Sequence, residues 1–129
     1  MDEKVKILLV EDDPMMSRLF QRGFSLQGFD AQVAGNGLEG VEKAKAMQPA
    51  IILLDVMMPK MNGLQALEKL KADDATKKIP VFMLTNLVNE PDAKSALSHG
   101  AAKYLIKSDH DTSEIVRMVQ EFLTASRGT

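Results

Sequence analysis

The sequence predicts a doubly wound α/β domain in which five parallel strands alternate with five helices. Short apolar runs are followed by longer segments with helical spacing of apolar residues, which is typical of strand–helix units on a parallel sheet. The runs at Val5–Val10 and Ile51–Leu54 are almost continuously apolar, as expected of strands covered on both faces. A length of 129 residues suits one domain, which we expect to span residues 1–129.

The first half of the chain is expected to supply three strands and two helices. Asp13 and Pro14 mark the start of the first helix, because Asp is a favoured N-cap and Pro loses no hydrogen bond in the first turn. The second strand is more polar than the others and is expected at an edge, whereas the third is the most apolar and is expected at the centre. In chain order, the elements are a strand at 5–10, a helix from Pro14 to about Gly28, a strand at 29–34, a helix at 37–47 and a strand at 51–54.

The second half is expected to supply two strands and three helices. Asp111 can cap the last helix, because Glu114 stands three residues later and can bond back to the cap. We expect the tail at 126–129 to be disordered. The elements are a helix at 63–72, a strand at 81–84, a short helix from Pro91 to near Gly100, a strand at 103–106 and a helix from about Asp111.

Composition excludes several classes of protein. Hydrophobic residues make up 45% of the chain and charged residues 26%, which is globular rather than disordered composition. No apolar run approaches the roughly 20 residues needed to cross a bilayer, and the first residues lack a secretory pattern, so we expect a cytoplasmic protein. The absence of cysteine excludes disulfides, thiol nucleophiles and cysteine-ligated metals. A net charge of −2 gives no electrostatic footprint for nucleic acid or anionic membranes, so we expect direct binding of neither.

Polar residues stand at the carboxyl ends of the predicted strands, where ligands bind in open parallel sheets. Glu11 and Asp12 follow the first strand, and Asp55 follows the third. Thr85 follows the fourth strand and Lys107 follows the fifth. These side chains are therefore expected on one edge of the sheet.

Crowded carboxylates predict a divalent cation, since they repel one another unless a positive charge compensates them. Mg²⁺ prefers octahedral oxygen ligands, which Asp12 and Asp55 could provide with Glu11 one shell further out. Zinc is disfavoured because no histidine or cysteine takes part. Asp55 could also be a nucleophile, because Asp carboxylates form acyl phosphates. Lys107 would then balance charge on the phosphoryl oxygens, and Thr85 would donate a hydrogen bond to one of them.

Several of these residues also allow simpler interpretations. Asp13 is better assigned as a helix cap than as a ligand, because it directly precedes Pro14. Each remaining strand-end residue, taken singly, could be a turn residue or a solvated charge. Residues 35–40 match the pattern GxGxxG of dinucleotide-binding loops, with Asp55 twenty residues after Gly35. An Asn-Gly turn that starts a helix on an edge strand explains this match better, because the nucleotide interpretation gives the other strand-end residues no role.

Four separated motifs together resemble the receiver domain of two-component response regulators. They are ILLVEDDP at 7–14, DVMMPKMNG at 55–63, MLT at 83–85 and YLIK at 104–107. The resemblance covers essentially the whole chain. It implies a flavodoxin-like, CheY-like sheet with strand order 2-1-3-4-5 and a role in phosphorelay signalling rather than metabolic catalysis.

The resemblance also implies a role for each matching residue. Asp55 would accept the phosphoryl group from a sensor histidine kinase, a phosphotransfer protein or a small phosphodonor. Mg²⁺, or Mn²⁺, would be bound by Asp55, by Asp12, by the backbone carbonyl of Met57 and, through water, by Glu11. Lys107 would pair with the phosphoryl group.

In the same family pattern Thr85 would swing toward the phosphoryl group and Tyr104 would follow inward. That movement would alter the face formed by the fourth helix, fifth strand and fifth helix, and so the binding of an output partner. The side chains of Met57 and Leu87 would flank the path of the hydrolytic water, and neither can polarise water.

The sequence leaves several questions open. The family usually has a cis proline after the lysine, whereas Ser108 follows Lys107 here, so the peptide bond could be cis or trans. An aspartate-phosphate enzyme is the competing class, but it needs a second acid two residues after the nucleophile, where Met57 stands. The output partner, the cognate kinase, the oligomeric state and whether the receiver stands alone are not determined.

Overall fold

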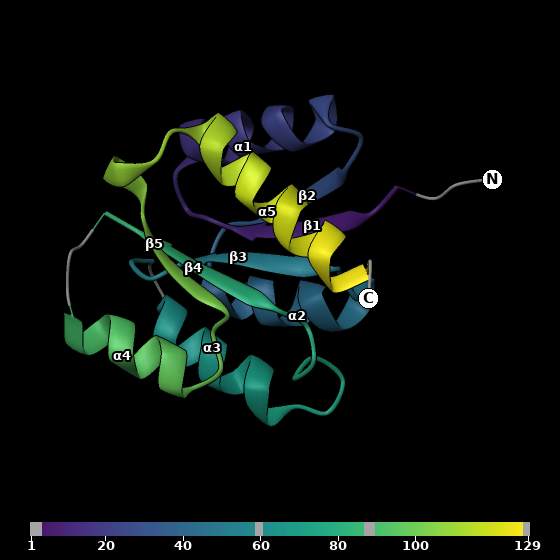
Figure 1. Cartoon of the computed structure of the whole chain (residues 1–129). Coiled ribbons are helices and arrows are strands. Elements are labelled where there is room, and N and C mark those ends of the chain that lie inside the picture. The colour runs from purple at the N-terminus through teal and green to yellow at the C-terminus, as the bar shows by residue number, and fades with distance from the viewer. Residues whose placement is uncertain (1–3, 59–60, 87–89, 128–129) are drawn as a thin grey trace.

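The computed structural model describes residues 4–58, 61–86 and 90–127. Its centre is a five-stranded parallel sheet in the order β2-β1-β3-β4-β5, which confirms the predicted doubly wound fold (Figure 1). The strands are β1 (Lys6–Val10), β2 (Asp30–Ala34), β3 (Ile51–Asp55), β4 (Val81–Thr85) and β5 (Lys103–Ile106). The helices are α1 (Pro14–Leu26), α2 (Gly37–Met47), α3 (Gly63–Ala72), α4 (Glu90–Ser98) and α5 (Thr112–Arg127), with a short 3₁₀ turn, η1, at Lys107–Asp109.

Helices cover both faces of the sheet. α1 and α5 lie on one face, and α2, α3 and α4 lie on the other (Figure 1). Alternation along β1 divides its side chains between the two cores: Ile7 and Leu9 pack with α1 and α5, and Leu8 and Val10 pack on the opposite side. β3 is buried along its whole length, as predicted for the central strand.

The predicted helix caps form. Asp13 accepts the backbone N–H of Met15 at 2.9 Å at the start of α1. Asp111 accepts the backbone N–H of Glu114 at 2.8 Å, and the Glu114 carboxylate accepts the N–H of Asp111 at 3.3 Å. These reciprocal bonds fix the start of α5.

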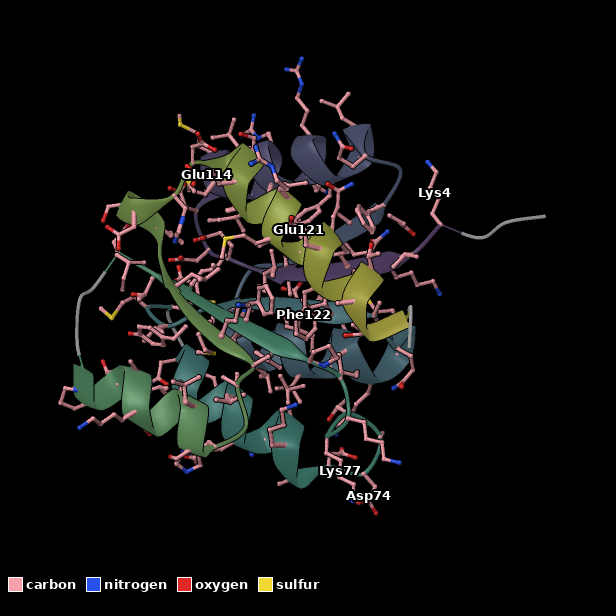
Figure 2. All side chains as sticks on the ribbon, viewed as in Figure 1. Lys4, Asp74, Lys77, Glu114, Glu121 and Phe122 are labelled. Atoms are coloured by element: carbon pink, nitrogen blue, oxygen red, sulfur yellow. The ribbon has the colours of Figure 1, made fainter. Side chains whose placement is uncertain are left out.

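The predicted disorder from Ser126 onward is wrong for the first two of those residues. α5 continues to Arg127, because its buried face extends as far as Leu123 and the Ser126 hydroxyl donates to the Phe122 carbonyl at 2.9 Å. Residues 128–129 lie outside the described part of the chain. Figure 2 shows Phe122 on α5 above the sheet, where its ring meets that of Phe82 edge-on at 5.0 Å between centroids.

Strand β2 lies at an edge, as predicted, and side chains cover part of that edge. The Gln21 side-chain amide on α1 donates to the Ala31 carbonyl at 3.1 Å. Lys43 on α2 donates to the carbonyl of Val33 from the other side. An open strand edge is a template for pairing with another chain, so these two contacts oppose self-association through β2.

Close packing explains the glycines that match the dinucleotide pattern. A Cβ at Gly37 would lie 2.2 Å from the Met61 carbonyl oxygen, and one at Gly40 would lie 2.8 Å from the Val10 side chain. Both distances are too short for any larger residue. The glycines therefore let α2 approach the sheet and the loop that follows β3.

We predict that Gly63→Ala destabilises the protein by about 1–3 kcal/mol or more, because its Cβ would meet the Asp55 carbonyl oxygen at 2.1 Å and backbone cannot yield cheaply. Urea unfolding measures the change in free energy. Gly35→Ala is the matched control, since its Cβ would have only an ordinary contact at 3.8 Å with the Glu39 side chain. Equal stability of the two variants would contradict this account of the loop.

Candidate functional site at the carboxyl edge of the sheet

The strand register brings the predicted site residues together. Asp55 pairs with Leu84, so Thr85 extends one residue beyond it on the neighbouring strand. Thr85 in turn pairs with Ile106, so Lys107 comes one residue later still. Glu11 follows β1, which adjoins β3 at the point where the strand order reverses. Four strand ends thus converge on one edge.

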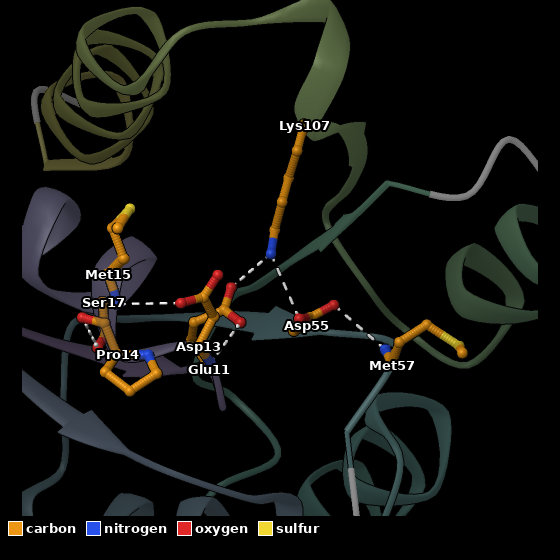
Figure 3. A network of polar contacts seen from close by, with 8 residues as sticks. All are labelled: Glu11, Asp13, Pro14, Met15, Ser17, Asp55, Met57 and Lys107. Atoms are coloured by element: carbon orange, nitrogen blue, oxygen red, sulfur yellow. Dashed lines mark hydrogen bonds and ion pairs between the residues drawn. The ribbon is translucent and has the colours of Figure 1, made fainter.

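Lys107 is the centre of the cluster. Its ammonium group forms an ion pair with Oε1 of Glu11 and a second, at 3.3 Å, with Oδ2 of Asp55 (Figure 3). The side chains of Lys107, Glu11 and Asp55 are only 9%, 2% and 8% exposed. The two carboxylates therefore face each other with one cation between them and little water to screen them.

This arrangement perturbs the pKa values of two groups. Burial raises the pKa of Glu11, and the negative charge of Asp55 adds to that effect, against the opposing influence of Lys107. Burial alone would lower the pKa of Lys107, but the hydrogen bond that Lys107 donates to Glu11 and the charges of both carboxylates outweigh it and raise that pKa. The lysine is therefore held in its charged form.

Backbone amides complete the network around the carboxylates. Met57 donates its backbone N–H to Oδ1 of Asp55 at 3.2 Å, in the first turn of the loop after β3. Asp13 donates its backbone N–H to Oε2 of Glu11 at 3.1 Å, while its own side chain caps α1 at Met15 (Figure 3). Each buried carboxylate is thus held at both oxygens.

The donor set fits a hard divalent cation. Glu11, Asp12 and Asp55 each offer a carboxylate oxygen, and these atoms lie within 4.8 Å of one another. Oxygen-only donors suit Mg²⁺ or Mn²⁺ and not zinc. Asp12 is exposed, whereas Glu11 and Asp55 are buried, so an ion would enter from the side of Asp12.

Thr85 and Tyr104 lie on the strands next to Asp55. Thr85 is fully buried at the end of β4, and Tyr104 on β5 pairs with Met83. The Tyr104 hydroxyl is shielded from solvent and has no hydrogen-bond partner among the residues that the structure describes. Burial and the nearby charge of Asp92 raise its pKa.

The sequence did not predict how Glu11 is used. It was expected one shell away from the metal, and its ion pair with Lys107 was not foreseen. The apolar run before Glu11 could have indicated an ion pair, because a carboxylate that ends a buried strand needs a partner. No peptide bond in the described segments is cis, so Ser108 follows Lys107 in the trans form and enters the η1 turn. Leu87 lies outside the described residues.

The chain belongs to the response regulator receiver domain family. The sequence model of that family matches residues 7–120. This assigns the protein to phosphorelay signalling in two-component systems, as the four motifs predicted. Proteins of this family are signalling proteins that interact with histidine kinases, and receiver domains generally bind Mg²⁺.

Similar proteins include longer regulators. The chain is 36% identical over 118 residues to the DNA-binding dual master transcriptional regulator RpaA of Synechocystis, covering 92% of this chain and 48% of that protein. It is 36% identical over 122 residues to the nitrate/nitrite response regulator protein NarL of Escherichia coli, covering 92% and 55%. The chain thus spans about half the length of these relatives. Because RpaA is named as DNA-binding, the comparisons do not support the expectation that nucleic acid is excluded.

Solved structures have the same fold. A signal receiver domain of a histidine kinase from Syntrophus aciditrophicus superimposes with a TM-score of 0.85 at 28% identity, covering 97% of this chain and 94% of that one. A CheY-like receiver domain protein from Methanospirillum hungatei gives a TM-score of 0.88 at 22% identity, covering 95% and 96%. Within the described residues, no helix has the length and apolar character that a membrane span requires.

Proposed function

We propose that Asp55 accepts a phosphoryl group from a phosphohistidine of a sensor kinase or phosphotransfer protein, or from a small donor such as acetyl phosphate. The observation that carries the proposal is the position of Lys107, whose ammonium group lies 3.3 Å from Oδ2 of Asp55. A cation held there can neutralise negative charge that develops on a transferred phosphoryl group. The protein would catalyse only its own phosphorylation and dephosphorylation.

The transfer step is an in-line displacement. A carboxylate oxygen of Asp55 attacks phosphorus, and the new O–P bond forms as the P–N bond to the donor histidine breaks. The electron pair of that bond leaves with the histidine nitrogen. Lys107 then pairs with a phosphoryl oxygen, and the Thr85 hydroxyl donates to another.

Mg²⁺ or Mn²⁺ would be held by Asp12 and Asp55 directly, by the Met57 carbonyl and by Glu11 through water. The three carboxylates within 4.8 Å support this assignment. When bound, the cation supplies positive charge that offsets the repulsion between the phosphoryl oxygens and the carboxylates. Asp13 would not be a ligand, because its side chain already caps α1.

Thr85 and Tyr104 would carry the signal to the face formed by α4, β5 and α5. Thr85 lies one residue beyond the partner of Asp55, and the shielded Tyr104 hydroxyl lies on the strand beside it. Movement of both side chains toward the phosphoryl group would change that face and the binding of an output partner. We place this receiver, spanning residues 1–129, in the cytoplasm, where kinases of this class present their phosphohistidine.

The exposed start of α1 is the surface that we propose for the phosphodonor. Met15 and Leu19 are 71% and 48% exposed, although both are apolar. They line a groove of about 430 Å³ with Arg18 and Arg22. Because α1 begins two residues after the acidic pair, a protein seated there would lie beside the edge of the sheet that carries Asp55.

We predict that acetyl phosphate with Mg²⁺ adds one phosphoryl group to the wild-type protein and none to Asp55→Asn, because an amide is not a nucleophile for phosphorus. Intact-mass spectrometry measures the adduct. Asp30→Asn is a control on another strand and should be modified like wild type. An unchanged adduct in Asp55→Asn would remove the basis of the proposed function.

Mg²⁺ binding should weaken sharply in Asp12→Ala and much less in Asp13→Ala. Asp12 belongs to the cluster of three carboxylates, whereas the Asp13 side chain already accepts a hydrogen bond from the Met15 amide. Isothermal titration calorimetry compares the two affinities. Equal losses in the two variants would show that the division between ligand and cap is wrong.

The phosphorylated state is expected to persist, because Met57 and Leu87 cannot hold or polarise an attacking water. The Met57 side chain is 60% exposed on the loop after Asp55, so a polar group there would meet solvent. Replacing Met57 with Asn and Leu87 with Glu should speed loss of phosphate by roughly tenfold or more. Decay of the intact-mass adduct measures the rate. The conservative pair Met57→Leu and Leu87→Met should decay like wild type, and a double polar variant that did the same would refute the lifetime argument.

A further inference from the structure

Glu11 connects Lys107 with the first turn of α1. Its Oε1 pairs with the Lys107 ammonium group, and its Oε2 accepts the backbone N–H of Asp13 at 3.1 Å (Figure 3). Asp13 in turn holds the start of α1 through two hydrogen bonds. Its side chain accepts the Met15 N–H at 2.9 Å, and its backbone carbonyl accepts the Ser17 N–H at 3.0 Å. A continuous series of contacts therefore runs from Asp55 through Lys107 and Glu11 to α1.

This series of contacts depends on the position of the Lys107 ammonium group. The Glu11 side chain is almost completely buried, and the Lys107 ammonium group pairs with its charge. The Lys107 ammonium group lies between Glu11 and Asp55, so a displacement toward new charge on Asp55 would lengthen its contact with Glu11. A buried carboxylate that loses its cation is strongly destabilised unless it finds another partner. The hydrated Mg²⁺ proposed beside Asp12 and Asp55 would be that partner. Glu11 would then turn toward the cation, and the Asp13 amide would lose its acceptor.

We infer that Glu11 is a positioning residue that couples Lys107 to α1, so that phosphorylation of Asp55 loosens the first turn of that helix. The inference rests on the proposed function, because it needs a phosphoryl group that draws Lys107 away from Glu11. It adds a second route out of the site, on the opposite face of the sheet from α4 and independent of Thr85 and Tyr104.

Loosening the first turn of α1 would change the exposed surface around Met15. The Met15 amide is held by the Asp13 cap, and its exposed side chain lies on the groove of the α1 face. A looser first turn would displace that side chain. The α1 surface would therefore differ before and after transfer, and a donor protein seated on it would bind the phosphorylated form more weakly than the unphosphorylated form.

Amide hydrogen exchange in the full chain, read by nuclear magnetic resonance, tests the inference. Three samples are compared: the protein alone, with Mg²⁺, and with Mg²⁺ and beryllofluoride, a stable mimic of the phosphoryl group. Exchange at Asp13 and Met15 should quicken by roughly threefold to tenfold on adding beryllofluoride to the Mg²⁺ sample, the effect of losing one hydrogen bond. The Glu39 amide, which the Asn36 cap of α2 holds at 2.9 Å, is the internal control and should not change.

Two variants separate this route from the one through β4 and β5. Glu11→Gln keeps the shape of the side chain and an acceptor for the Asp13 N–H, but it removes the charge that Lys107 compensates. On adding beryllofluoride, exchange at the Asp13 amide of this variant should change no more than exchange at the Glu39 amide. Thr85→Ala should abolish the change in the Tyr104 resonance and leave the Asp13 response intact. Glu11→Asp, which keeps the charge but is too short to hold both partners, should also lose the Asp13 response.

The outcomes are distinguishable. The fluorine signal of bound beryllofluoride reports occupancy of the site, and its absence in wild type would count against the proposed function itself. Occupancy without faster exchange at Asp13 would overturn the coupling to α1. A wild-type response in both Glu11→Gln and Glu11→Asp at full occupancy would overturn the role of Glu11.

Discussion

The ion pairs of Lys107 are the interaction on which the rest of the site depends. Glu11 and Asp55 end neighbouring strands and are almost completely buried, an arrangement that repulsion and desolvation would oppose without a cation. Lys107 supplies that cation from the end of β5, which lies two strands from β3 and three from β1. The parallel sheet makes this possible, because it delivers the ends of β1, β3 and β5 to one edge and covers both faces with helices.

Most of the fold could be predicted because its signals are local. Apolar periodicity distinguished strands from helices, and the caps at Asp13 and Asp111 lie within three residues of the amides that they bind. The candidate site was also accessible to sequence reasoning, since each of its residues directly follows an apolar run. Parallel strands carry such residues to a common edge, whatever the details of side-chain packing.

The remaining features depend on contacts between distant residues. Glu11 and Lys107 are separated by most of the chain, and nothing local indicates that the lysine contacts Glu11 as well as Asp55. The close approach of Gly37 to the Met61 carbonyl, and the helical end of α5, likewise depend on how helices pack. Local polarity at Ser126 indicated disorder, but the apolar face of α5 carries the helix further.

A site built around a shared cation responds to a change of charge as a unit. The ammonium group contacts both carboxylates, so new negative charge at Asp55 would directly alter the balance of charge at Glu11. β3 and β4 are buried along their whole length, whereas Asp12 and Asp13, which lead from β1 into α1, are exposed, and exposed segments open more readily than buried strands. Charge added at this edge would therefore act first on the segments that leave the strands. Those segments, including the exposed residue Met15, are where another protein can reach the site.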